Sequence, residues 1–298
     1  MKTLSNCPIC KTQIFDPFLT CKDYTVSQQN FTIVSCNNCN FKFTNPRPED
    51  KNLGDYYKSE DYISHSNTSK GVISKLYKQV RNYTLKKKLK LITNYVSRGT
   101  ILDYGCGTGM FLNACQKAGW KAFGMEPNEG ARKIASEMGL NTFSDKERIQ
   151  TYVGQQTFDI ITLWHVLEHV TDLEQTLTFF KEKLSRNGIL IIAVPNYTSY
   201  DANHYKQFWA AYDVPRHLYH YEIKTIKKLL EPYSFTLTET KPMKFDSFYV
   251  SMLSEKYKTG SINYFKAFLT GLKSNLKAKQ AKDYSSVIYV FKKELVGS

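Results

Sequence analysis

The stretch ILDYGCGTG, residues 101–109, decides the fold, because an apolar run meets an acid and then glycine stands at every second position. A glycine-rich turn after a strand is typical of a nucleotide site. The dinucleotide spacing G-x-G-x-x-G needs glycine at position 110, which is Met110, and a phosphate loop ending in Gly-Lys-Ser/Thr is absent. The carboxylate of Asp103 would also repel a pyrophosphate. The turn therefore favours a nucleoside with a positively charged tail.

Strands and helices alternate outward from this turn. Strands that are apolar throughout and alternate with helices predict a parallel sheet covered on both faces, with the ligand at the carboxyl ends of the strands. Glu126 ends the second strand, where its two oxygens are placed to accept both ribose hydroxyls. The expected strands are 100–105, 121–127, 140–143, 158–164, 189–196, 235–240 and 285–293, and the expected helices include 110–119, 129–139 and 173–188.

Three motifs, ILDYGCGTG, GMEPN and FDIITLWHVLEHV, resemble those of class I S-adenosylmethionine-dependent methyltransferases over residues 99–240, with a last strand near 286–293. The resemblance implies a Rossmann-like doubly wound methyltransferase sheet with an antiparallel last strand, and S-adenosylmethionine as the methyl donor. It implies that Asp103 and the turn hold the methionine moiety, Glu126 the ribose, and the residues after strand four the adenine or the sulfonium. The expected donor-binding residues are Asp103, Gly105, Cys106, Gly107, Gly109, Glu126, Pro127, Trp164 and His165.

Two C-x-x-C pairs occur near the N-terminus, CPIC and CNNC. Their cysteines, Cys7, Cys10, Cys36 and Cys39, predict a closed four-thiolate site for structural zinc within a ribbon over residues 1–45, and Cys21 is surplus. A module this small buries little core, so we expect the metal to supply its folding energy. The ribbon and the stretch VPRHLYHYEIKTIKKLL resemble a bacterial group of zinc-ribbon methyltransferases, many of which go with sugar, lipid or natural-product pathways.

Methylation of oxygen or carbon needs a base, for which histidine is the usual choice. His165, at the end of strand four, is the first candidate, and His217 is the second. Some quinone-type O-methyltransferases carry a similar LEHV stretch, in which the acid and the histidine take a divalent metal. Magnesium on Glu168 and His169 is an alternative that we do not expect here, because local packing or capping by His169 explains the pattern more simply.

Residues that face the methyl acceptor are expected on either side of the donor site. The segment 46–98 comprises a linker and an amphipathic helix that caps the catalytic domain, 99–298. The predicted acceptor-binding residues are Tyr62, His65, Arg81, Arg216, His217 and His220, although Arg216 could instead hold its own loop in place.

The net charge of +14 is concentrated in two segments. Residues 70–98 hold nine basic residues and no acid, and residues 241–298 hold eleven lysines and four acids. Within a helical insertion at about 246–284, the helix 262–279 places Ile262, Phe265, Phe268, Leu269, Leu272 and Leu276 on one face, with lysines around the rest. A basic amphipathic helix of this kind contacts an anionic membrane, closes over the active site as a lid, or packs on its own domain.

The length, the core-forming composition, the missing apolar signal segment and the missing membrane span predict a cytoplasmic enzyme, with peripheral contact at the inner membrane face as an addition. We expect a methyltransferase acting on a small-molecule, sugar or lipid-like acceptor. The alternative is an RNA methyltransferase that binds RNA through the ribbon and the basic segments. Strand four lacks the N/D-P-P-Y/F motif common in methylation of base amines, so we favour a small molecule over nucleic acid.

Overall fold

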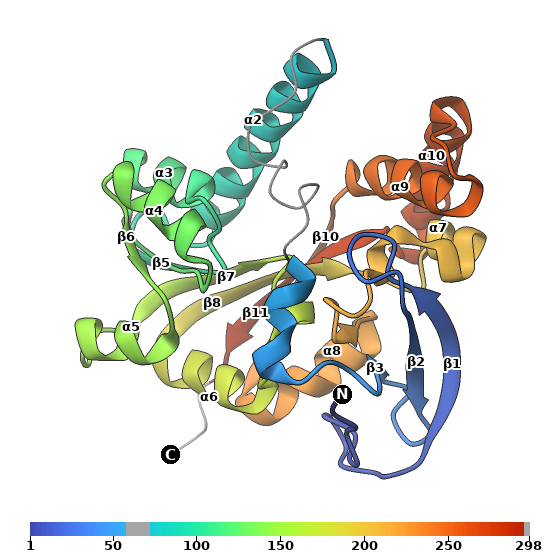
Figure 1. The fold of residues 1–298 in the computed structure, drawn as a ribbon. Helices are drawn as coiled ribbons and strands as arrows, with labels where there is room; N and C mark the ends of the chain where they lie inside the picture. The colour runs from blue at the N-terminus through green and yellow to red at the C-terminus, as the bar shows by residue number, and fades with distance from the viewer. Residues whose placement is uncertain (58–71, 295–298) are drawn as a thin grey trace.

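A seven-stranded sheet forms the centre of the molecule (Figure 1). The computed structural model describes residues 1–57 and 72–294, without the side chains of 72–78. The strand order is β10-β11-β8-β7-β4-β5-β6, and only β11 runs antiparallel to its neighbours. The predicted Rossmann-like sheet with an antiparallel last strand is therefore confirmed. The strands are β4 (Thr100–Tyr104), β5 (Lys121–Met125), β6 (Asn141–Phe143), β7 (Phe158–Trp164), β8 (Leu184–Pro195), β10 (Phe235–Pro242) and β11 (Ser286–Lys293).

Short polar caps start the helices between these strands. Asn128 accepts a hydrogen bond from the Ala131 amide at the start of α4, and Asp172 accepts one from Gln175 at the start of α6. The expected helix over 173–188 ends earlier, because β8 begins directly after Lys183 and contains the glycine that was expected to stop the helix. The helices are α2 (Val72–Thr93), α3 (Met110–Lys117), α4 (Glu129–Glu137), α5 (Lys146–Val153), α6 (Leu173–Lys183), α7 (Tyr200–Tyr205) and α8 (Ile223–Leu230).

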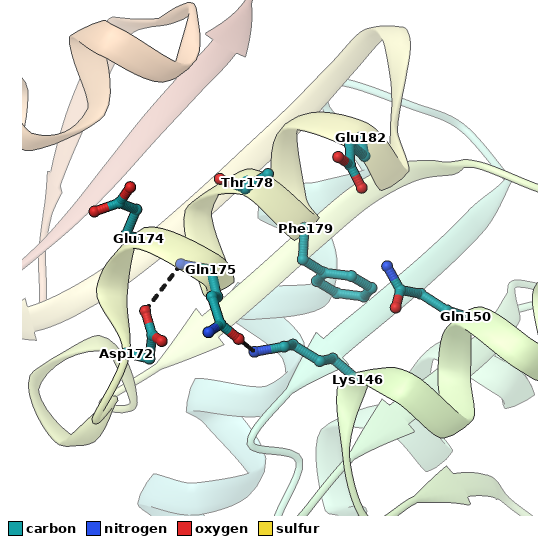
Figure 2. A pocket seen from close by; sticks show the side chains of 8 residues that line it. All are labelled: Lys146, Gln150, Asp172, Glu174, Gln175, Thr178, Phe179 and Glu182. Atoms are coloured by element: carbon teal, nitrogen blue, oxygen red, sulfur yellow. Dashed lines mark hydrogen bonds between the residues drawn. The ribbon is translucent and has the colours of Figure 1, made fainter.

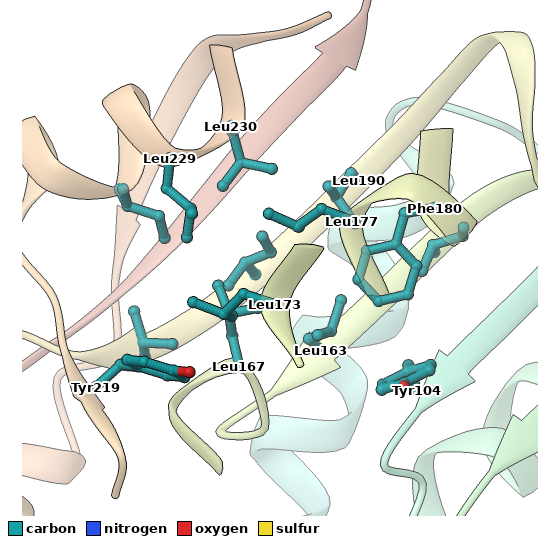
Figure 3. Packing of buried hydrophobic residues seen from close by; sticks show 14 of the residues in the cluster. Tyr104, Leu163, Leu167, Leu173, Leu177, Phe180, Leu190, Tyr219, Leu229 and Leu230 are labelled. Carbon is teal, nitrogen blue, oxygen red and sulfur yellow. The ribbon is translucent and has the colours of Figure 1, made fainter. Parts of the chain in front are cut away.

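Two apolar cores cover the two faces of the sheet. Along β4 the side chains alternate, so that Ile101 packs with residues of α2, α3 and α4, while Leu102 joins the core made with α5, α6 and α8. Figure 3 shows the second core, in which Leu177 of α6 faces Leu230 of α8. Because Leu177 is fully buried, its truncation to alanine would cost about 2–5 kcal/mol. Packing on both faces leaves the strand ends for the functional site.

The N-terminal segment forms a second sheet that is completed by the catalytic part of the chain. Its strands are β1 (Phe15–Lys22), β2 (Asn30–Cys36) and β3 (Lys42–Thr44), and β3 pairs with β9 (Tyr219–His220). Phe41 and Phe43 pack in the same core as Tyr219 and Tyr221. This segment therefore has apolar packing against the catalytic part of the chain, in addition to any folding energy that a metal supplies.

The insertion between β10 and β11 is a helical hairpin of α9 (Asp246–Thr259) and α10 (Tyr264–Ala281). It lies at one end of the molecule above α7 (Figure 1). The sequence left three alternatives for α10: contact with a membrane, a lid over the active site, or packing on its own domain. The helix packs on α9 and α7 through small residues. Its large apolar side chains face outward, since Phe265 is 74% exposed and Leu276 52% exposed. Among the described residues, no helix combines the length and hydropathy needed to cross a membrane.

Candidate active site

The turn after β4 lies at the carboxyl edge of the sheet, where β4 separates β5 from β7. The amides of Gly105 and Cys106 both donate to the Met125 carbonyl, which ties the turn to the end of β5. Gly105 has a φ of +78°, and a Cβ there would stand 2.4 Å from a methyl of Val166. Gly107 also has a positive φ, but a Cβ there would meet nothing within 4 Å. The turn therefore packs tightly against the protein at Gly105, whereas the space beside Gly107 is open.

Glu126 directly follows β5 and lies against this turn. Its Oε2 accepts a hydrogen bond from the Gly107 amide at 2.9 Å, and its Oε1 accepts one from the Asn128 amide at 2.9 Å. A carboxylate has about four lone-pair sites, so acceptor capacity remains on both oxygens for a ribose diol. Pro127, the next predicted donor residue, is exposed, and its carbonyl accepts from Arg132.

Asp103 lies inside β4 rather than on the surface of the turn. It is 2% exposed, and its Oδ1 accepts a 2.7 Å hydrogen bond from the Thr162 hydroxyl of β7. Burial raises the pKa of Asp103 to about 6, against the opposing effects of this hydrogen bond and of Lys88. The Asp103 carboxylate is therefore bonded to β7 and is almost fully removed from the surface.

Lys88 of α2 is a residue of this site that the sequence did not single out. Its ammonium lies 4.2 Å from the ring centroid of Trp164 and 5.9 Å from that of Phe111. Burial lowers the pKa of Lys88 to about 8, and the charges of Asp103 and Asp246 oppose that shift. In the sequence Lys88 is one of nine basic residues in a basic segment, so only the fold separates it from solvated lysines.

Trp164 ends β7 beside this lysine. Its indole meets Phe111 edge to face, with ring centroids 5.5 Å apart. The buried indole Nε1 has no hydrogen-bond partner among the described residues. An unpartnered buried donor beside a cation and a glycine turn is a fitting place for a polar ligand.

His165 adopts a φ of +58°, and its amide donates to the Ala193 carbonyl at the adjacent edge of β8. Its Nε2 lies 3.0 Å from Oδ2 of Asp246, and its Nδ1 lies 3.4 Å from Oε1 of Glu168. Burial alone would lower the pKa of His165, but the two carboxylates outweigh it and raise the pKa to about 10. His165 is therefore a cation at neutral pH, and a cation is not a general base. Asp246, 81 positions later in the insertion, gave no signal in the sequence.

Glu168, His169 and His217 form a second cluster, in which the ligand atoms lie within 4.8 Å of one another. The rings of His169 and His217 are 4.6 Å apart, and Tyr57 of η1 (Asp50–Tyr57) lies 2.9 Å from Nδ1 of His169. Oε2 of Glu168 is buried without a hydrogen-bond partner in the described part of the chain, whereas Oε1 is paired with His165. The cluster therefore offers two imidazoles and one carboxylate in a polar setting.

His217 is held as a neutral imidazole in this cluster. Burial lowers the pKa of His217 well below its usual value of 6.5, and the nearby His169 adds to that effect. Its Nδ1 lies 2.8 Å from the Ala211 carbonyl, which fixes the proton on Nδ1. Nε2 is then the acceptor nitrogen, 3.9 Å from a carboxylate oxygen of Asp213.

Arg216 and His220 lie at the seam with the N-terminal sheet. The Arg216 guanidinium bonds the carboxylates of Asp213 and Asp23 and the Tyr56 carbonyl, and its side chain is 3% exposed. Nε2 of His220 lies 3.3 Å from the Thr44 hydroxyl, and burial lowers the His220 pKa to about 3. Both side chains bond across the seam, so we do not propose them as acceptor-binding residues.

The remaining predicted acceptor residues lie on or before α2. Arg81 is half-buried, and its Nε has no hydrogen-bond partner in the described residues. Tyr62 and His65 lie outside the described residues.

The four predicted metal cysteines come together in one cluster. The Sγ atoms of Cys7 and Cys39 are 3.5 Å apart, those of Cys10 and Cys36 are 3.4 Å apart, and all four lie within 4.8 Å of one another. Each C-x-x-C turn closes in the same way: the residue after its second cysteine donates to the carbonyl of its first. Tetrahedral zinc with bonds of about 2.3 Å needs sulfur separations of about 3.8 Å, so the donors fit that ion. Cys21 lies elsewhere, in the core with Trp209.

A separate surface groove runs between α5 and α6 (Figure 2). At its mouth the Lys146 ammonium donates to the Gln175 side chain at 2.9 Å, next to the cap of Asp172. The groove includes none of the candidate donor, acceptor or base residues. Its lining residues are Lys146, Gln150, Asp172, Glu174, Gln175, Thr178, Phe179 and Glu182.

Comparison with known proteins connects this geometry to a family. A family model described as a methyltransferase domain matches residues 77–240. The ubiquinone biosynthesis O-methyltransferase of Actinobacillus pleuropneumoniae serotype 7 is 36% identical over 108 residues, which is 33% of this chain and 46% of that protein. The protein of the same name from Rickettsia prowazekii is 26% identical over 144 residues, 46% of this chain and 57% of that protein. The chain spans about half the length of the curated relatives it matches.

A solved structure supports the fold. Magnesium protoporphyrin IX methyltransferase from Synechocystis PCC 6803 with bound SAH is 15% identical, covers 83% of this chain and 100% of its own, and superposes with a TM-score of 0.53. At that identity the likeness shows the fold alone. The match to the family model covers more than half of the chain, from α2 to β10, and includes the glycine turn, Glu126 and His165. The chain belongs to the methyltransferase-domain family.

Proposed function

We propose that this methyltransferase takes its methyl group from S-adenosylmethionine and transfers it to an oxygen or carbon atom of a small-molecule, sugar or lipid-like acceptor. The observation that carries the proposal is the turn 105–109, which is open at Gly107 and backed by the carboxylate of Glu126. The printed name of several curated relatives, ubiquinone biosynthesis O-methyltransferase, supports a small-molecule acceptor.

The residues around the turn fit this donor. When bound, S-adenosylmethionine supplies an electrophilic methyl group on a sulfonium ion. We assign the backbone of Gly105 to Gly107, with the open space beside Gly107, to the methionine moiety, and the free lone pairs of Glu126 to the ribose. Lys88 provides the only cation on α2 that lies against Trp164 in the described structure, and we assign it to the α-carboxylate of the donor. Asp103 balances the ammonium through its buried charge.

We assign the general base to His217 rather than His165. The first is held neutral, with Nε2 free to accept a proton, whereas the second is held as a cation by Asp246 and Glu168. His165 then orients the edge of the site and does not remove a proton. This assignment reverses the order in which the sequence ranked the two histidines.

The cluster of Glu168, His169 and His217 also has the composition of a divalent cation site. An ion bound to Nε2 of His217 would occupy the lone pair that a base needs, so the two roles exclude each other. We propose the base, because the hydrogen bond between Nδ1 and the Ala211 carbonyl orients the His217 ring and leaves Nε2 as the acceptor. Activity that is lost in EDTA and restored by magnesium would instead assign the cluster to the metal.

For the four-cysteine cluster we propose structural zinc, as in the zinc-ribbon methyltransferase group. The support is the sulfur geometry together with the closed donor set, which leaves no position for a substrate. The family match begins at residue 77 and so does not include these cysteines.

The test begins with donor binding. Calorimetry with S-adenosylhomocysteine is expected to show one site, and Asp103→Ala should abolish it. Asp103→Asn is the matched variant, because it keeps an acceptor for Thr162 while removing the charge. If the variants melt like the parent and still bind normally, the assignment of Asp103 is wrong. Complete failure of the parent chain to bind would overturn the enzyme proposal.

Acceptor class is tested by transfer of labelled methyl groups to a small-molecule extract, a lipid extract and total RNA. We expect labelled methyl groups in the small-molecule extract or in the lipid extract. Label only in RNA would overturn the small-molecule acceptor and support the RNA alternative.

A further inference from the structure

The outward face of α10 is an exposed apolar stripe. At about 100° per residue, Phe265, Leu272 and Leu276 fall within roughly 40° of one another around the helix axis. They are 74%, 37% and 52% exposed. The other large exposed side chains along the stripe are Tyr264, Phe268 and Leu269. Contiguous apolar surface of this kind marks an interaction site.

Packing fixes this orientation of the helix. The inward face consists of small residues, Ala267, Thr270, Gly271, Ser274 and Ala278, all buried against α9 and α7. A Cβ on Gly271 would stand 3.0 Å from the Cα of Phe248, so the two helices approach too closely for a larger residue. Ser274 donates a 2.6 Å hydrogen bond to the buried carboxylate of Asp201. Turning the apolar stripe inward would break this contact and force leucine and phenylalanine into that narrow space.

The charged residues of α10 indicate which kind of partner binds the apolar stripe. α10 carries Lys266, Lys273, Lys277 and Lys279, all exposed, and no acidic residue. The first three border one side of the stripe, and Lys279 lies at its C-terminal end. An apolar stripe bordered by lysines matches the boundary between acyl chains and anionic headgroups. The lysines of a second copy of this face would repel these lysines. RNA would contact the lysines but would not bury the phenylalanine and leucine side chains.

We propose that the outer face of α10 docks on an anionic lipid bilayer, with the helix axis parallel to the membrane surface and the apolar side chains inserted between headgroups. The first residue of α9, Asp246, contacts His165, so the docked hairpin is joined directly to the donor edge of the sheet. Docking would thus hold the active site next to the lipid phase. This inference does not rest on the identity of the methyl acceptor.

The experiment is vesicle co-sedimentation of the full chain. Mixed phosphatidylglycerol–phosphatidylcholine vesicles are expected to bind it, pure phosphatidylcholine vesicles much less, and added salt should weaken binding. The double variant Phe265→Ser with Leu276→Ser should weaken binding by about tenfold or more. Ile134→Ser on α4 removes an apolar residue of 45% exposure elsewhere and should leave binding unchanged.

Charge is tested separately. Lys266→Glu with Lys273→Glu should weaken binding by roughly thirtyfold or more, since each lysine near an anionic surface contributes about a factor of five. The matched control is Lys227→Glu with Lys228→Glu, two exposed lysines of α8. All of these positions are exposed, and thermal melting together with S-adenosylhomocysteine binding checks that each variant is folded.

Three outcomes would overturn the proposal: equal binding to both vesicle types, equal loss in the control variants, or no vesicle binding by the folded parent chain. Concentration-dependent dimerisation that Phe265→Ser abolishes would assign the face to a second copy. RNA binding that responds to the lysine variants and not to the apolar ones would assign the basic border to nucleic acid.

Discussion

Replacing Lys88 with methionine tests the donor site most directly, because methionine keeps much of the apolar stem and removes the charge. If the ammonium binds the donor α-carboxylate in this half-buried site, the contact is a charge-assisted hydrogen bond worth about 1.5–3 kcal/mol. S-adenosylhomocysteine should then bind roughly ten- to a hundredfold more weakly to Lys88→Met. Methylthioadenosine has the nucleoside and no amino-acid tail, so its affinity should change little.

The pKa of Lys88 gives the same contact a second signature. Burial lowers that pKa to about 8, so the ammonium fraction in the free protein falls from about nine tenths near pH 7 to about one tenth near pH 9. Affinity for S-adenosylhomocysteine should therefore fall about tenfold more over this range in the parent chain than in Lys88→Met. The ligand's own amine titrates equally in both proteins, so the comparison removes its contribution.

Isothermal titration calorimetry measures both effects. Lys90→Met, two positions along the same helix and exposed, is the matched control and should bind like the parent. Equal losses for S-adenosylhomocysteine and methylthioadenosine would show that Lys88 supports the shape of the site through Trp164 and does not bind the carboxylate. Unchanged affinity for both ligands would refute the assignment of Lys88 altogether.

Three further predictions concern the cysteine cluster, the buried histidine and the seam. Cys39→Ser should reduce bound zinc, measured by elemental analysis, from one equivalent to well below it, with a lower melting temperature. Asp246→Asn should lower the pKa of His165 from about 10, which NMR of the imidazole measures. Because pairing raises this pKa, the pair stabilises the fold fully below about pH 6.5 and loses that contribution as the pH rises towards 10. The free energy of unfolding of Asp246→Asn should therefore fall below that of the parent chain at low pH and approach it at high pH. Arg216→Met leaves the carboxylate of Asp23 buried without its cation and should cost about 3–5 kcal/mol in urea unfolding. The first prediction would be contradicted by an undiminished zinc content in Cys39→Ser, and the second by an unchanged pKa of His165 in Asp246→Asn. An unchanged urea midpoint in Arg216→Met would contradict the third.

Local patterns were sufficient for the sheet and for the cysteine cluster. Apolar runs separated by helical periodicity predicted every strand of the seven-stranded sheet, and the paired C-x-x-C spacing predicted four sulfur atoms at one point. Both signals lie within a few residues of the structure that they specify. The boundary after Lys183 was missed, because a glycine in a polar stretch was taken as a helix stop although it is buried within β8.

Contacts between distant segments could not be predicted in this way. The pair of His165 and Asp246 is separated by 81 positions and depends on how the insertion returns to the sheet. The orientation of α10 was left open, since helical periodicity identifies two faces but does not say which one packs. Here the close approach of α9 selects the small-residue face at Gly271, although burial of the leucines would have gained more from the hydrophobic effect.

The contact of Asp246 with His165 joins the insertion to the part of the chain that the family model matches. The family match, residues 77–240, holds the glycine turn, Glu126 and His165, which we assign to the donor site. Asp246 and α10 follow the match, yet Asp246, together with Glu168, raises the pKa of His165 within it. The pairing of His165 with Asp246 of the insertion is therefore one reason why we propose His217, and not the histidine that the sequence ranked first, as the general base.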